Sequence, residues 1–235
     1  DWSWTPLLVD FDNDGHRDLI VTNGFPKDVT DHDFITYRNK AYSFASKTQL
    51  LVEIPEVKIH NYAFKNNADL TFSDVTTDWG LKMPTFSNGA AYADLDNDGD
   101  LDLVVNNVNM ESFVYRNNSE KNKANHFIKV KLKGENQIKF AIGSIVELYA
   151  GKEIIRQELI PSRGFQSSID YVMTFGIGTK KMDSLQVIWP NGKFQTIQKV
   201  VRNSTMNLSI SNAKKDYVFK KTQPKSLLKE NKSNF

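Results

Sequence analysis

A short acidic segment that occurs twice constrains this chain more than any other feature. Residues 10–23 and 94–107 are identical at nine of 14 aligned positions, which indicates an internal structural repeat. Each copy places at least four carboxylates within nine residues. Like charges at this spacing repel one another unless a cation lies among them. The fold therefore has to provide two places where such a segment can surround a positive charge.

The spacing of the carboxylates suits a hard divalent cation. Side chains at loop positions 1, 3 and 5 converge on one point, a glycine at position 6 permits a sharp turn, and position 7 offers its backbone carbonyl. An EF-hand is excluded, because its glutamate position 12 is Val21 in one copy and Val105 in the other. Position 9 is aspartate in both copies and can complete the coordination. We predict two calcium ions, held by Asp10, Asp12, Asp14, His16 and Asp18 and by Asp94, Asp96, Asp98, Asp100 and Asp102.

Position 7 is occupied by His16 and Asp100, which we expect to act through their carbonyl groups, with the imidazole facing solvent. The alternative of a metal-free acidic surface hairpin is disfavoured because the pattern occurs twice. Magnesium is disfavoured because it demands stricter octahedral geometry and retains its waters. Apolar residues precede both loops and β-branched residues follow them, so we expect each loop to join two buried strands.

The charge distribution divides the chain into two parts. The net charge is +2, but residues 1–124 carry 11 Lys+Arg and 20 Asp+Glu (−9), whereas residues 125–235 carry 19 and 8 (+11). Such a change indicates two units of different chemistry. The absence of cysteine excludes a disulfide scaffold, a thiolate zinc site and a cysteine nucleophile. No apolar run is long enough for a membrane span.

The pattern of the chain predicts an all-β fold with one helical insertion. Residues 1–124 are expected to contain the two repeats, interrupted by a helix at about 30–51 that packs against them. Residues 125–211 show short alternating segments separated by turns, which predicts a small β-sandwich. In its first strand Ile128, Val130 and Leu132 should face the core, with the alternate residues facing solvent. Residues 212–235 carry seven Lys and two acids and are expected to be a basic linker or the start of another unit.

The two loops, with the segments 71–75, 79–81, 86–94 and 114–118 around them, resemble the FG-GAP/VCBS repeat family. The resemblance implies calcium loops in the blades of a β-propeller. Two repeats cannot close a propeller, which needs at least four blades. We therefore expect a partial β-propeller within this chain.

The second part of the chain is similar to the ASPIC/UnbV family in the segments 125–130, 141–146, 163–168, 175–178 and 187–193. The layout of repeat, inserted segment, repeat and ASPIC/UnbV resembles large VCBS-repeat proteins of bacterial outer surfaces. This resemblance, and a start at Asp1 shortly before a metal loop, lead us to expect a piece of a longer exported protein whose precursor has a signal peptide.

No catalytic motif stands out in the sequence. A phosphate-binding glycine loop, a nucleophile elbow and a zinc-binding His pair are all missing, and carboxylates held by calcium are poor proton carriers. Arg163 and Phe165, an arginine and an aromatic residue on an expected turn, could grip a carboxylate or stack on a sugar, although a purely structural arginine is the simpler interpretation. The basic residues of the second part are interleaved along strands, so we expect no nucleic-acid partner.

These features predict a calcium-stabilised, non-catalytic surface scaffold or binding module. Its location would be extracellular or on the outer-membrane surface, where calcium is concentrated enough to fill weak sites. Its partners would be a polysaccharide or the proteins of an outer-membrane uptake or adhesion complex. One alternative is a fragment of a propeller enzyme whose active site lies in blades outside this chain, and another is a purely structural accessory subunit.

Overall fold

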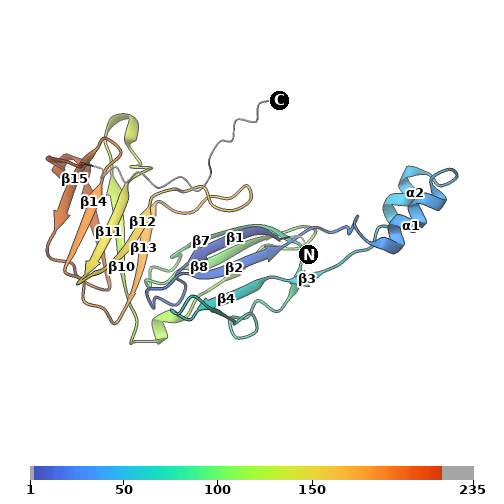
Figure 1. The fold of residues 1–235 in the computed structure, drawn as a ribbon, viewed down its shortest axis with the longest axis horizontal. Coiled ribbons are helices and arrows are strands. Elements are labelled where there is room, and N and C mark those ends of the chain that lie inside the picture. Colours follow the sequence, from blue (N-terminus) through green and yellow to red (C-terminus); the bar gives the residue numbers. More distant parts are fainter. Residues whose placement is uncertain (1–2, 219–235) are drawn as a thin grey trace, which may run out of the picture.

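The computed structural model describes residues 3–218, and this part of the chain is mostly β-structure. Figure 1 shows two groups of sheets side by side and a pair of short helices at one end. The first group holds strands β1 to β9, and we call it the N-terminal region. The second holds strands β10 to β17, and we call it the C-terminal region.

The N-terminal region contains two larger sheets, one for each acidic loop. The first sheet has the order β1-β2-β4-β5, with β1 Ser3–Val9, β2 Asp18–Asn23, β4 Tyr62–Asn66 and β5 Phe72–Asp74. The second has the order β7-β8-β9, with β7 Ser87–Ala93, β8 Asp102–Asn107 and β9 Phe113–Tyr115. A small ladder joins β3 Ile59–His60 to β6 Pro84–Thr85. All of these pairings are antiparallel.

One hydrophobic core joins the two larger sheets of the N-terminal region. Leu7 and Ile20 from the first sheet and Ala90 and Val105 from the second are fully or almost fully buried in the same cluster. Burial of apolar surface on both sheets holds them together as a unit. Within residues 3–218 these sheets do not close into a ring.

The C-terminal region also contains two sheets over one core. A three-stranded sheet has the order β13-β10-β16, with β10 His126–Lys133, β13 Val172–Gly178 and β16 Ser204–Ser209. A five-stranded sheet has the order β12-β11-β14-β15-β17, with β11 Ile145–Ala150, β12 Glu153–Glu158, β14 Ser184–Ile188, β15 Lys193–Ile197 and β17 Lys215–Asp216. Buried residues of both sheets form a single hydrophobic cluster.

Single 3₁₀ turns lie at Ser119–Lys121, Asn136–Ile138 and Ile210–Asn212. The turn after Trp189 closes a hairpin: the Trp189 N–H donates to the Lys193 carbonyl (2.8 Å), and Ile188 pairs with Phe194. The end of the chain was expected to be a linker from residue 212, but Ala213 is buried and β17 pairs with β15. The remainder of that predicted linker, residues 219–235, lies outside the described residues.

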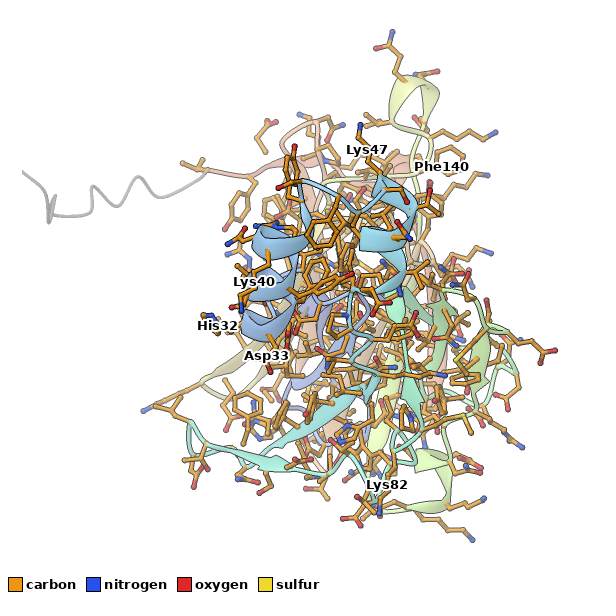
Figure 2. The ribbon with its side chains drawn as sticks, turned by 90° about the vertical axis from the view of Figure 1, so that its right-hand side faces the viewer. His32, Asp33, Lys40, Lys47, Lys82 and Phe140 are labelled. Carbon is orange, nitrogen blue, oxygen red and sulfur yellow. The ribbon has the colours of Figure 1, made fainter. Side chains whose placement is uncertain are left out.

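The helical insertion differs from its prediction. Instead of one helix packed on the sheets, there are two, α1 His32–Ala41 and α2 Lys47–Val52. Asp31 caps the first by accepting from the Phe34 N–H, and Ser46 and Gln49 form a capping box at the second. The helices lie away from both groups of sheets (Figure 1). Figure 2 looks at the molecule from the end that carries the helices, and it shows His32 and Lys40 on the side of α1 that faces away from α2.

The apolar residues whose spacing predicted the helix do not share one buried face. Phe34 and Ala41 are buried, but Tyr37 and Phe44 are 42% and 80% exposed. No helix among the described residues is long and apolar enough to cross a membrane.

The difference between these two environments is testable by truncation. Phe175 is fully buried in the C-terminal core, whereas Phe44 is exposed. Phe175→Ala should lower the free energy of unfolding by about 3–5 kcal/mol, and Phe44→Ala should change it by less than about 0.5 kcal/mol. Urea denaturation of the two variants measures both values. Equal losses would show that the helical hairpin packs on a surface that this structure leaves open.

Candidate metal centres

Each acidic loop joins the first two strands of its sheet at the same place. In the first loop, residues 10–17 connect β1 to β2, and Val9 pairs with Asp18. In the second, residues 94–101 connect β7 to β8, and Ala93 pairs with Asp102. The buried strands on either side fix both ends of each loop, as the sequence predicted.

The two loops share their internal hydrogen bonds. The carboxylate at position 1 accepts from the glycine N–H at position 6: Gly15 to Asp10 at 2.8 Å and Gly99 to Asp94 at 3.0 Å. The carboxylates at positions 3 and 5 each accept from the N–H two residues further on. The two glycines have φ of 94° and 103°, a conformation that side chains other than glycine rarely adopt. The repeat in sequence is therefore also a repeat in backbone geometry.

The aspartate at position 9 ties each loop to the third strand of its sheet. Asp18 accepts from the Phe11 N–H (3.0 Å) and from the Asn66 N–H (3.0 Å). Asp102 accepts in the same way from Leu95 (2.9 Å) and Asn117 (2.8 Å). Both Asp18 and Asp102 are buried. Because these hydrogen bonds orient both carboxylates, position 9 forms a fixed side of each loop.

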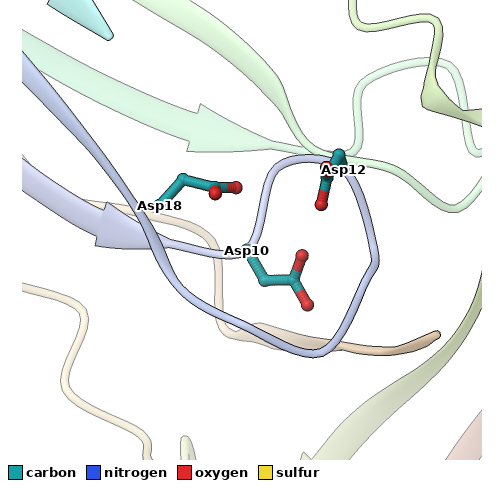
Figure 3. A group of neighbouring side chains, drawn as sticks. All are labelled: Asp10, Asp12 and Asp18. Carbon is teal, nitrogen blue, oxygen red and sulfur yellow. The ribbon is translucent and has the colours of Figure 1, made fainter. Parts of the chain in front are cut away.

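Each loop brings three carboxylates together. The carboxylate oxygens of Asp10, Asp12 and Asp18 lie within 4.8 Å of one another, and so do those of Asp94, Asp96 and Asp102. Figure 3 shows the first group, with the three side chains directed into the space that the loop surrounds. Positions 1, 3 and 9 thus converge in both copies, and either group could hold a metal ion.

The buried charge in these loops is unfavourable without a cation. Burial raises the pKa of Asp10 well above its usual value, opposed by the Gly15 hydrogen bond and reinforced by Asp14, Asp12 and Asp18. Burial also raises the pKa of Asp18 to about 6. The Asp94 Oδ1 atom is buried and has no hydrogen-bond partner among the described residues. An oxygen-only donor set with an unpartnered buried carboxylate oxygen fits calcium, which takes six to eight oxygen ligands.

Positions 5 and 7 lie beside these groups rather than inside them. Asp14 forms an ion pair with Lys65 (3.1 Å), and the His16 N–H donates to Asp14 (2.8 Å). Asp98 and Asp100 form a further carboxylate group with Glu120. Asp100 is 1% exposed and accepts from the Glu120 N–H (3.0 Å), and its burial raises its pKa to about 7.

Basic side chains neutralise part of the loop charge. Lys65 pairs with Asp12 and Asp14, and in the second copy Arg116 pairs with Asp96 (2.8 Å) and Asp98 (3.3 Å). The roles of these residues and of the asparagines that follow them were not predicted. Lys65-Asn66-Asn67, at the end of β4, and Arg116-Asn117-Asn118, directly after β9, are nevertheless equivalent segments in the sequence.

Both loops lie against the C-terminal region. The Asn13 carbonyl accepts from the Gly178 N–H (2.9 Å), and the Asp12 carbonyl accepts from the Asn125 side chain (2.8 Å). At the second loop, the Lys129 Nζ lies 2.5 Å from the Asp94 carboxylate. The side chains of Lys129 and Asp94 are only 10% and 3% exposed. Lys129 was expected on a solvated face, and it is buried because this face of β10 covers the second loop.

Two glycines allow the two regions to approach closely at this junction. A Cβ on Gly176 would lie 2.0 Å from an Asp10 carboxylate oxygen, and a Cβ on Gly99 would lie 1.9 Å from the Phe127 ring. The Asn13 side chain also donates to the Gly99 carbonyl (3.2 Å), which links one loop to the other. The candidate metal centres therefore lie at the contact between the two regions and not at a free edge.

Arg163 and Phe165, the other predicted ligand-binding residues, have separate surroundings. The Phe165 ring packs on Trp4 with a centroid distance of 4.4 Å, and its N–H donates to Thr5 (3.1 Å). These contacts give Phe165 a packing role at the junction. Arg163 instead lines a cavity between the two regions.

Comparison with known families agrees with this division of the chain. Residues 10–105 match the family model described as FG-GAP-like repeat, and residues 134–215 match the one described as ASPIC and UnbV. Human cartilage acidic protein 1 is 24% identical over 207 residues, which cover 86% of this chain and 27% of that protein. This chain thus spans about a quarter of the length of that relative.

The matches confirm both resemblances that the sequence motifs indicated. Together they point to a repeat and binding module, with acidic groups of the kind that FG-GAP repeats commonly use for calcium. Residues 10–105 are thus similar to FG-GAP-like repeats and residues 134–215 to ASPIC and UnbV, and the chain has distant homology to cartilage acidic protein 1.

Proposed function

We propose that this chain is a calcium-stabilised, non-catalytic binding module of a larger surface protein. The observation that carries the proposal is the pair of equivalent carboxylate groups, Asp10, Asp12 and Asp18 and Asp94, Asp96 and Asp102, in loops with matching hydrogen bonds. A cation of charge +2 in each loop offsets carboxylates that would otherwise repel one another. Asp14 and Asp98 complete the oxygen set by side-chain rotation, and the carbonyls of His16 and Asp100 add position 7.

The proposed role of calcium is structural, and it extends beyond the loops. Each loop bonds to the C-terminal region, through Gly178 and Asn125 at the first and through Lys129 at the second. An ion that fixes the loop backbone thereby fixes the surface on which the ASPIC/UnbV region rests. Calcium would set the orientation of one region relative to the other.

The two sheets of the N-terminal region would be two blades of a β-propeller completed by other parts of the full protein, and the C-terminal region would be a β-sandwich. The support is the shared core of each pair of sheets and the repeat-family match. We place this protein outside the cell or on the outer-membrane surface, within an uptake or adhesion complex whose partners are proteins or a polysaccharide. Turnover of a glycan by the full protein, lost on mutation of residues outside the loops, would instead identify a propeller enzyme.

Removal of single loop carboxylates tests the metal sites. Asp96→Ala and Asp98→Ala should lower the melting temperature in calcium by several degrees, because each removes a ligand. In EDTA the same variants should change it little, since Arg116, their ion-pair partner, is exposed and such pairs contribute little. Differential scanning calorimetry in both buffers gives the comparison.

Asp78→Ala is the matched control, because Asp78 is an exposed aspartate of the same region outside both loops. It should behave like the unmodified protein in both buffers. Equal losses for Asp96→Ala in calcium and in EDTA would defeat the metal assignment.

The pH dependence of stability should differ with and without calcium. The folded-state pKa of Asp18 is about 6, above its usual 3.8, so the folded protein binds this proton more tightly than the unfolded chain. In EDTA the melting temperature should therefore rise as pH falls from 7.5 to 5. In calcium this rise should vanish, because protons and the ion compete for the same oxygens.

Asp18→Asn supplies the comparison for that measurement. An amide cannot titrate, so the variant should lose part of the pH dependence in EDTA. A melting temperature in EDTA that falls steadily from pH 7.5 to 5 in the unmodified protein would contradict the expectation.

The contribution of the C-terminal region to the first metal site can be tested at Gly176. Its added methyl group in Gly176→Ala would meet the Asp10 carboxylate and displace the position 1 ligand. Calcium affinity measured by isothermal titration calorimetry should fall for one of the two ions and stay unchanged for the other. Two unchanged affinities would show that the loops bind calcium without support from the second region.

A further inference from the structure

A cavity of about 480 Å³ lies at the junction, beside the first acidic loop, and Asp10 of that loop lines part of its wall. Both regions contribute to its wall. Arg17 and Tyr92 come from the N-terminal region, and Arg156, Gln157 and Arg163 come from the C-terminal region. Its volume lies in the range of about 300–1,000 Å³ that is typical of small-molecule sites.

The cavity is rich in arginine, and its arginines are poorly neutralised. Among the described residues Arg17 and Arg163 form no ion pair, and Arg156 has only a 3.5 Å contact with Glu147. Two acids also line the cavity, Asp10 and Glu158, but Asp10 belongs to the metal loop. Three arginines line one space, and arginine favours an anion because its planar donors match a carboxylate or sulfate.

Hydrogen bonds hold the Arg17 and Arg163 side chains in place. The Arg17 guanidinium donates to the Arg156 carbonyl across the junction (2.6 Å). Arg163 hydrogen-bonds the Tyr92 hydroxyl, and both Arg163 and Arg17 lower the pKa of that hydroxyl against the stronger effect of burial. The Arg163 N–H donates to the Ser167 carbonyl (3.1 Å). Arg163 and Arg17 are therefore positioned near Tyr92 before any ligand arrives, which reduces the entropy lost on binding.

The other residues that line the cavity suit a ligand that has apolar surface and hydroxyl groups as well as a negative charge. Pro6 and Leu8 provide apolar surface, which suits the carbon face of a sugar ring. Gln157 donates its amide N–H to the Thr174 carbonyl (2.9 Å), so its side-chain oxygen stays available as an acceptor. Glu158 supplies further acceptors. A simple inorganic anion has no hydroxyl to satisfy these acceptors, whereas an acidic sugar has several.

We propose that this cavity binds an acidic saccharide, with the carboxylate or sulfate group held by Arg163 and Arg156 and the sugar ring against Tyr92. The inference rests on the binding role proposed above and gives it a site and a ligand class. Because residues of both regions line the cavity, the ligand would be sensed only when the two regions are docked.

The test uses the full chain in calcium and a matched pair of probes. Methyl glucuronide and methyl glucoside differ only in the carboxylate, and their binding can be followed by chemical-shift titration. We expect the glucuronide to bind at least about tenfold more tightly than the glucoside, since one charge-assisted contact contributes ~1.5–3 kcal/mol. Arg163→Gln and Arg156→Gln should each weaken glucuronide binding by about tenfold, and Arg202→Gln, an exposed arginine outside the cavity, should not.

Inorganic sulfate and a short acidic peptide complete the experiment. Sulfate that binds as tightly as the glucuronide would overturn the saccharide assignment, and so would a peptide that binds where the glucuronide does not. Equal binding of the two sugar probes would also overturn it. The calcium-dependent rise in melting temperature should persist in both arginine variants. If calcium does not raise the melting temperature of the unmodified protein, the calcium role is refuted. If calcium raises the melting temperature but the glucuronide does not bind, only the saccharide site is refuted.

Discussion

Electrostatic repulsion among crowded carboxylates is the constraint on which the rest of this structure depends. Each acidic loop buries an aspartate at position 9 and directs two more toward it. Backbone N–H groups of each loop and of residues at the end of the third strand donate to these carboxylates, and Lys65 and Arg116 form ion pairs with them. Even with these contacts, the Asp94 Oδ1 atom is buried and has no hydrogen-bond partner among the described residues. A divalent cation would supply what protein donors do not.

The same crowding explains why the loops lie at the junction between the regions. A loop whose backbone is held by its own carboxylates presents fixed carbonyls, and the Asn13 carbonyl accepts from Gly178 of the other region. Glycine at position 176 lets β13 approach the Asp10 side chain closely. Lys129 adds a buried charge pair with Asp94, which is favourable only where both groups stay in contact. Docking of the two regions and order in the loops are therefore coupled.

Much of the local structure was predictable because it follows from short-range rules. The loops and their flanking strands were expected from carboxylate spacing and from the apolar residues on either side, and the structure shows them. The helical insertion was predicted wrongly in its packing, because helical spacing of aromatic residues does not say which surface they cover. Phe44 follows the pattern and is exposed. The hydrogen bonds of Asn66 and Asn117 to the position 9 aspartates were not predicted, because the loop residues alone do not indicate a donor from another strand.

Ligand spacing and the glycine turn are local properties, so residues 10–18 and 94–102 alone are enough to specify two loops of equivalent geometry, each with carboxylates suited to a hard cation. The positions of those loops and the groups that face them depend instead on long-range packing. Lys129 occupies a position that alternation assigns to solvent, yet it is buried on Asp94. Arg17, Arg156 and Arg163 are far apart in the chain and share one cavity. Such groupings arise when two folded regions dock, and docking depends on surfaces that no single segment encodes.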